Sequence, residues 1–147
     1  MSEHNLTLVK YLPVPPEVVF NAWTTPEHMS NWFSPAGMPV SVPKLDLRVG
    51  GEYRVDMHGD GKDYVHTGKY IEIDRPNRLV FSWFSDGTEQ KETIVTLDLK
   101  SDGDGTMLRL THERFTSEKS RDDHNGGWSD ILDRLESVLA KRTETGT

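Results

Sequence analysis

Apolar and polar residues alternate with a period of two through the middle of the chain. This pattern predicts strands, because successive side chains of a strand point to opposite faces of its sheet. One such segment covers residues 6–12, and six more follow between residues 41 and 114, separated by turn sequences at hairpin spacing. Pro43 assigns the segment 41–47 to a sheet edge, because proline cannot donate to a ladder. We therefore expect a meandering antiparallel sheet of about seven strands.

Helical spacing replaces this alternation in two places, directly after the first strand and again after the last one. Pro15-Pro16 and Thr25-Pro26 open two short helices after the first strand, since proline is tolerated in a first turn. A long helix is predicted over residues 117–141. Its apolar stripe comprises Trp128, Ile131, Leu132, Leu135, Val138 and Leu139.

Two glycines interrupt this long helix. Gly126 and Gly127 each cost about 1 kcal/mol relative to alanine inside a helix. The cost suggests a packing requirement, a close approach of the helix to the sheet or to a loop. The alternatives are a kink, or a helix that begins later, near Trp128.

Local signals mark the turns and one irregular strand. The sequence predicts a turn over residues 59–62 and a hairpin at Asp86-Gly87. A bulge is expected at Gly68, because the apolar parity shifts near Tyr70. The bulge leaves the direction of Glu72 open, and Glu72 is the one acidic candidate for an inward position.

An α+β fold follows from the order strand, two short helices, six strands and a long helix. A single apolar stripe must be buried, and the only large partner is the sheet. A strongly curved sheet cannot contact a straight helix everywhere, so a cavity is expected between them. We expect one domain over residues 1–147, with an ordered core over about residues 6–140.

Composition narrows the class of function. The chain has 147 residues, a net charge of −7 and no cysteine. The acidic balance argues against nucleic-acid binding, and the absence of cysteine excludes disulfides, thiol nucleophiles and Cys-ligated metals. No signal peptide and no apolar run long enough for membrane insertion are visible, so a cytoplasmic protein is expected.

Five sequence blocks resemble a known family, the homologues of the activator of the Hsp90 ATPase. They lie in family order and cover about residues 6–139. The blocks are residues 16–27 (PEVVFNAWTTPE) followed by Trp32, residues 50–53 (GGEY), 68–73 (GKYIEI), 78–83 (RLVFSW), and 124–128 (HNGGW) with Leu132 and Leu135.

The resemblance implies the helix-grip fold of the START-like (SRPBCC) superfamily, in which a curved seven-stranded antiparallel sheet surrounds a long C-terminal helix. It also implies a hydrophobic ligand cavity between the sheet and that helix. It does not imply one activity, because the superfamily contains lipid carriers, polyketide cyclases, dehydratases and co-chaperone domains.

Side chains of inward parity define the expected cavity lining. Several are aromatic, and flat rings can stack on a flat ligand. The expected lining comprises Trp32, Phe33, Tyr53, Met57, Tyr64, His66, Phe81, Trp83, Val95, Leu97, Leu110, His112, His124, Trp128 and Leu132.

Three histidines within that set carry the candidate chemistry. His66 and His112 share inward strand parity and are the only weak catalytic candidates, because an imidazole in an apolar cavity can move protons. The alternative for each is a core histidine that is bonded to a backbone carbonyl. His124 lies one turn before Trp128, and it either lines the cavity mouth, caps the helix or is exposed at the surface.

No metal or cofactor is predicted. The run Asp56-x-His58-x-Asp60-Gly61 resembles half a calcium loop, but Thr67 stands where the twelfth position needs glutamate. The leading hypothesis is a module, monomeric or homodimeric, that binds an apolar or aromatic small molecule. A cyclase- or hydrolase-type enzyme using His66 or His112 is one alternative, and a co-chaperone-like domain with a chaperone partner is another.

Overall fold

The computed structural model describes residues 4–144. The elements follow the predicted order, with two short 3-10 helices added. They are β1 (His4–Leu12), α1 (Pro16–Thr24), α2 (Pro26–Met29), η1 (Pro35–Gly37), β2 (Val40–Leu45), β3 (Glu52–Gly59), β4 (Lys62–Asp74), β5 (Arg78–Trp83), η2 (Asp86–Thr88), β6 (Thr93–Asp102), β7 (Gly105–Phe115) and α3 (Glu118–Glu144).

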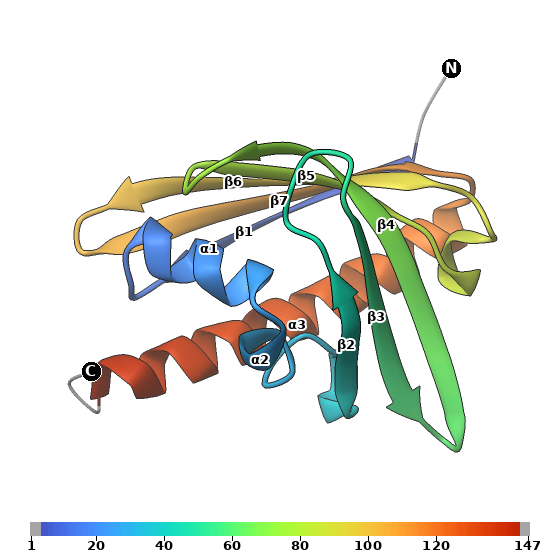
Figure 1. The fold of residues 1–147 in the computed structure, drawn as a ribbon, viewed down its shortest axis with the longest axis horizontal. Helices are drawn as coiled ribbons and strands as arrows, with labels where there is room; N and C mark the ends of the chain where they lie inside the picture. The colour runs from blue at the N-terminus through green and yellow to red at the C-terminus, as the bar shows by residue number, and fades with distance from the viewer. Residues whose placement is uncertain (1–3, 145–147) are drawn as a thin grey trace.

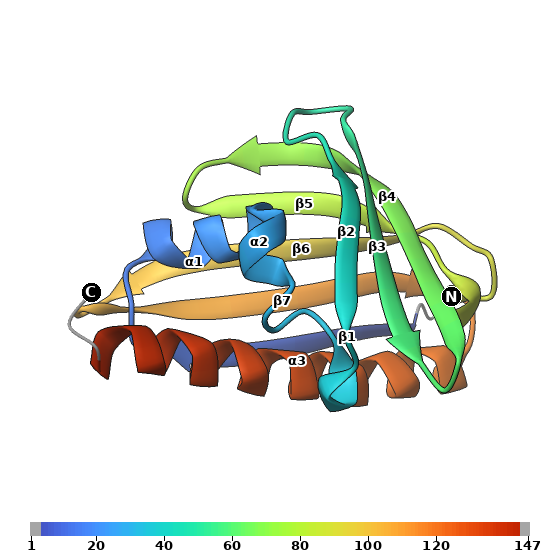
Figure 2. The same cartoon turned by 60° about the horizontal axis from the view of Figure 1, so that its bottom comes forward.

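The seven strands form one antiparallel sheet in the order β1-β7-β6-β5-β4-β3-β2. The strand that contains Pro43, β2, lies at an edge, as predicted. Figure 1 shows the sheet arched over α3, with α1 and α2 beside the same concave face. β1 and β5–β7 run roughly along α3, whereas β2 and β3 cross it steeply (Figure 2). This is the curved sheet around a long helix that the periodicity predicts.

The change of direction falls within β4. Gly68 lies so close to β5 that a Cβ atom there would be 2.0 Å from the carbonyl oxygen of Ser82. The predicted bulge at Gly68 is misplaced, because the register against β5 shifts between Tyr70 and Glu72. Glu72 consequently points to solvent, 3.4 Å from Arg78, and is not an inward carboxylate.

The apolar stripe of α3 packs against the sheet as predicted. Trp128, Leu132 and Leu135 are almost completely buried. On β1, Lys10 shares the inward parity of Leu8 and Leu12 and donates to Asp133 of α3 at 2.7 Å. An ion pair therefore adds to the apolar contact where the first strand meets the helix.

Five rings fill most of the space between the sheet and the helix. We call Trp23, Trp32, Phe33, Trp83 and Trp128 the aromatic cluster. The centroids of Trp23 and Trp32 lie 4.8 Å apart, and those of Trp83 and Trp128 lie 5.2 Å apart. Because these rings pack on one another, the expected cavity does not extend along the whole helix.

The glycine pair in α3 has no packing requirement. A Cβ atom at Gly126 or Gly127 would meet nothing within 4 Å, and the helix continues through both residues. The expectation of a close approach to the sheet or a loop is therefore wrong.

Replacing either glycine with alanine should stabilise the protein. We expect Gly126→Ala and Gly127→Ala each to raise the free energy of unfolding by about 0.5–1 kcal/mol, because alanine has the better helix propensity and meets no neighbour. Chemical denaturation measures both. Gly68→Ala is the contrasting control and should destabilise strongly, and a loss of stability in both helical variants would contradict the packing described here.

Candidate functional site

A hollow of about 650 Å³ opens at one end of the aromatic cluster. The β3–β4 hairpin, η1, η2 and the first half of α3 surround it. It is lined by Pro35, Ala36, Met38, Met57, Gly59, Asp60, Tyr64, Val65, His66, Trp83, Ser85, Asp86, Gly87, Asp123, His124, Gly127, Trp128 and Ile131.

Polar contacts hold both 3-10 helices against α3. The amide of Ala36 in η1 donates to the carboxylate of Asp130. The hydroxyl of Ser120 donates to the carbonyl of Gly87 in η2 at 2.6 Å. A Cβ atom at Gly87 would lie 3.2 Å from His124, so glycine permits this close approach. The predicted hairpin at Asp86-Gly87 is thus a longer connection whose 3-10 helix forms one wall of the hollow.

Six of the fifteen expected cavity residues line this hollow: Met57, Tyr64, His66, Trp83, His124 and Trp128. The other nine do not line it. They are packed in the core: Trp32, Phe33, Tyr53, Phe81, Val95, Leu97, Leu110, His112 and Leu132. The physical reason is that large inward side chains contact each other wherever the sheet approaches the helix.

His112 is fully buried and fully bonded. Trp128 donates its indole N–H to Nδ1 of His112 at 3.0 Å, so this nitrogen must be an unprotonated acceptor. The other nitrogen, Nε2, therefore carries the proton and faces the Thr93 hydroxyl at 2.7 Å. Burial lowers the pKa of His112 well below its usual value. His112 is therefore a core histidine, but its partners are the side chains of Trp128 and Thr93 and not the expected backbone carbonyl.

His124 repeats this arrangement at the wall of the hollow. Its Nδ1 lies 2.9 Å from the carbonyl of Ser120, which can only accept, so Nδ1 carries the proton. Nε2 then accepts the indole N–H of Trp83 at 3.4 Å. Burial lowers the pKa of His124.

His66 is the histidine with unused hydrogen-bonding capacity. Its ring lies over Trp83, with centroids 4.7 Å apart. Within the described residues, its buried Nδ1 has no hydrogen-bond partner. Burial, reinforced by the nearby His124, lowers the pKa of His66 to about 4, so the ring is neutral at neutral pH. Other atoms of the ring line the hollow, whereas Nδ1 itself is buried.

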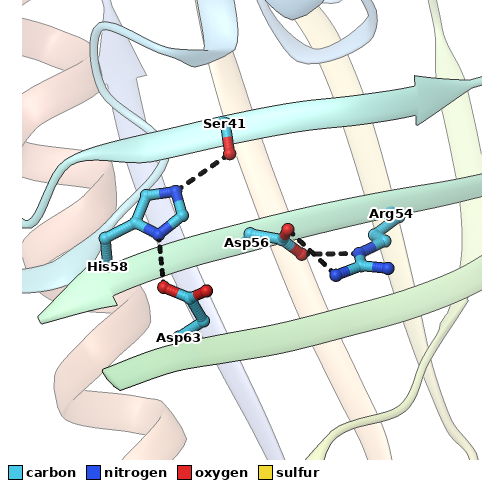
Figure 3. Close-up of polar contacts among 5 residues, drawn as sticks. All are labelled: Ser41, Arg54, Asp56, His58 and Asp63. Atoms are coloured by element: carbon cyan, nitrogen blue, oxygen red, sulfur yellow. Dashed lines mark hydrogen bonds and ion pairs between the residues drawn. The ribbon is translucent and has the colours of Figure 1, made fainter. Parts of the chain in front are cut away.

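A Ser-His-Asp arrangement lies on the opposite face of the sheet (Figure 3). Nε2 of His58 is 2.9 Å from the Ser41 hydroxyl, and Nδ1 is 2.7 Å from Asp63. The Asp63 side chain is 65% exposed, and none of the three residues lines the hollow. The contacts join β2, β3 and β4, so we interpret them as cross-strand pairs that hold the sheet edge.

The resemblance to half a calcium loop does not produce a cluster of ligands. Asp56 pairs with Arg54 at 2.8 Å, next to the His58 pair (Figure 3), whereas Asp60 lines the hollow. Within residues 4–144, no group of three or more His, Cys, Asp or Glu side chains could hold a metal ion.

Sequence patterns alone do not identify most of the polar and loop residues in the lining. Met38 and Asp60 lie outside the periodic segments, and Asp123 precedes the apolar stripe of α3. Two sequence signals do lie in the lining, since Asp86-Gly87 contributes both of its residues and Gly126-Gly127 contributes Gly127. The sequence alone indicates a turn and a packing feature at these positions.

Comparison with solved structures identifies the class of fold. A protein from Chromobacterium violaceum superposes with a TM-score of 0.86 at 24% identity, covering 92% of this chain and 96% of its own. A Rhodobacter sphaeroides protein gives 0.80 at 26% identity over 94% and 93%, and the AHSA1 protein of Silicibacter pomeroyi gives 0.78 at 24% over 94% and 99%. The molecule is a helix-grip domain.

The sequence also assigns the chain to a family within this class of fold. The family model described as "Activator of Hsp90 ATPase homolog 1-like protein" matches residues 13–140, and the chain belongs to this family. No curated protein matches the sequence. Across the described residues, none of the helices has the length and apolar character needed to cross a membrane.

Removing the indole N–H of Trp128 should destabilise the fold, because this group donates a hydrogen bond to His112. We expect Trp128→Phe to lower the free energy of unfolding by about 1–3 kcal/mol, because a buried acceptor is left unsatisfied. Chemical denaturation of this variant, of His112→Leu and of the double variant measures the coupling. Strictly additive losses would contradict a bond between the two side chains.

Acid should destabilise the fold through its histidines. The pKa values of His66, His112 and His124 are all lowered in the folded protein, to about 4 for His66. The unfolded chain therefore binds more protons below pH 6.5, and stability is lost as the pH falls from 6.5 towards 4. Each histidine that stays neutral contributes up to about 1.4 kcal/mol per pH unit.

Urea denaturation at a series of pH values measures this slope. His66→Gln should reduce the slope, because it removes one of the three buried neutral rings. A free energy of unfolding that stays constant between pH 6.5 and 4.5 would contradict the buried neutral state of these rings.

Proposed function

We propose that this protein binds an apolar, aromatic or lipid-like small molecule in the hollow between the β3–β4 hairpin, η1, η2 and α3. The observation that carries the proposal is an open cavity of about 650 Å³ whose walls are largely apolar and aromatic and include the ring of His66. Ligand pockets of proteins commonly have volumes of about 300–1,000 Å³.

The character of the walls supports this class of ligand. Met57, Trp83, Trp128 and Ile131 present apolar side chains, and the aromatic rings offer flat surfaces for stacking. Both indole N–H groups are already bonded to histidines. His66 is therefore the candidate group for orienting a ligand by one hydrogen bond.

The glycine pair adds a second line of support. Gly127 lines the hollow although glycine weakens the helix and no neighbour excludes a Cβ atom there. A side chain at this position would occupy the hollow. Retaining ligand space is a physical reason for glycine at this position.

An enzyme acting on the bound compound is the second candidate, and His66 favours it. A neutral imidazole with a free nitrogen can serve as a general base. Mass spectrometry of a compound before and after incubation distinguishes the two functions. An unchanged compound supports a binding module, and a changed compound that survives intact with His66→Gln identifies an enzyme.

Filling the hollow should weaken binding without unfolding the protein. We expect Gly127→Leu to weaken binding of the neutral dye Nile red by about tenfold or more, which corresponds to about 1.4 kcal/mol. Gly126→Leu is the matched control, because it adds the same side chain one residue away on an exposed position outside the hollow. Fluorescence titration measures both affinities.

Equal affinities for the two variants and the wild type would place the dye elsewhere and contradict the proposal. Native mass spectrometry of protein purified from its source provides an independent test. A copurified small molecule that is lost with Gly127→Leu and kept with Gly126→Leu is the expected result.

A further inference from the structure

We propose that the hollow selects hydrophobic cations, that is, aromatic or alicyclic amines, over isosteric alcohols and carboxylates. This inference rests on the proposed function and specifies its ligand class. It follows from the charges that surround the hollow and from the hydrogen-bond donors that remain free within it.

Every formally charged side chain in the lining is a carboxylate. Asp60 comes from the β3–β4 turn, Asp86 from η2 and Asp123 from α3, and the lining contains no lysine or arginine. Carboxylates on three separate elements give the mouth a negative potential that low-dielectric walls concentrate.

Neighbouring groups compensate this charge only in part. Asp123 accepts from Lys119 at 2.8 Å, which offsets one charge. Asp86 accepts from the neutral side chain of Gln90, which leaves its charge in place. Within residues 4–144, the carboxylate of Asp60 has neither a hydrogen bond nor an ion pair. Two uncompensated carboxylates therefore remain at the mouth.

A bound carboxylate would find little to replace its hydration shell. The indole N–H groups of Trp83 and Trp128 are bonded to His124 and His112. His66 can donate one hydrogen bond but carries no charge at neutral pH. An anion in the hollow could pair only with neutral donors, such as the hydroxyls of Tyr64 and Ser85, so its charge would stay uncompensated in an apolar site.

A cation has favourable partners in the same place. The exposed ring of Tyr64 in the lining can attract an ammonium group, and Nζ of Lys62 already lies 5.2 Å from its centre. The apolar walls accept the hydrocarbon part of an amine, and Asp60 and Asp86 lie at the mouth to face its charge.

Three ligands of nearly equal shape test the selectivity: 2-(aminomethyl)naphthalene, 2-(hydroxymethyl)naphthalene and 2-naphthoate. Calorimetric titration at pH 7.5 should give an affinity for the amine about tenfold or more above that for naphthoate, with the alcohol between them. In the Asp60→Asn/Asp86→Asn variant the amine should lose most of this advantage. Asparagine suits the positive φ of 55° at Asp60, so the fold should be preserved.

Asp102→Asn/Asp104→Asn is the matched control, because it also removes two charges, at the β6–β7 turn outside the hollow, and should leave the preference unchanged. Naphthoate binding as tightly as the amine would overturn the selectivity while leaving the proposed function in place. An equal effect of the control variant would assign the preference to net charge and overturn the role of the mouth. If none of the three ligands binds, and Gly127→Leu leaves the affinity for Nile red unchanged, both proposals are wrong.

Discussion

The bond from the Trp128 indole to Nδ1 of His112 fixes how the long helix meets the sheet. It joins the first residue of the apolar stripe of α3 to the inward face of β7, and both side chains are buried. An indole can only donate, so the bond also sets the tautomer of His112 and directs its other nitrogen to Thr93. The Thr93 hydroxyl in turn donates to the carbonyl of Trp83 at 2.7 Å. One chain of hydrogen bonds thus links α3, β7, β6 and the end of β5.

The location of the hollow follows from this anchor and from the bend of the sheet. β1 and β5–β7 run along α3 and can pack against it through large side chains. Beyond Gly68 the β3–β4 hairpin crosses the helix axis, so close packing cannot continue there (Figure 2). The aromatic cluster ends at Trp83 and Trp128, and the open volume begins on the other side of the same two rings. Core and hollow therefore share a wall.

The sequence was sufficient to predict the fold because the fold depends on periodicity. The inward positions of β1, β6 and β7 and the stripe of α3 lie where the alternation and helical spacing place them. The extent of the hollow was not predictable in this way. Inward parity identifies side chains on the concave face of the sheet. It does not tell whether such a side chain packs against a neighbour, as Leu97 does, or lines open space, as Tyr64 does. The remaining walls come from η1 and η2, whose positions depend on single contacts such as Ser120 with Gly87.

The hydrogen-bond partners of the histidines could not be predicted from the sequence either. Parity placed His66 and His112 on the inner side of the sheet, and the structure separates them by their partners. His112 lies opposite a donor and a hydroxyl on neighbouring elements, so both of its nitrogens are occupied. His66 stacks on Trp83, whose N–H points instead to His124, and this leaves a nitrogen of His66 free. The difference depends on which histidine each tryptophan reaches across the core, and no local sequence pattern encodes that choice.

The glycine pair of α3 connects stability with the hollow. A glycine inside a helix is unfavourable by about 1 kcal/mol relative to alanine, and neither residue is required by packing. Gly126 faces solvent, whereas Gly127 faces the hollow beside Trp128. At Gly127 a longer side chain would improve the helix and reduce the open volume at the same time. The proposed ligand site and the stability of the helix therefore favour different residues at this position. Glycine keeps the volume of the hollow open and lowers the stability of the helix.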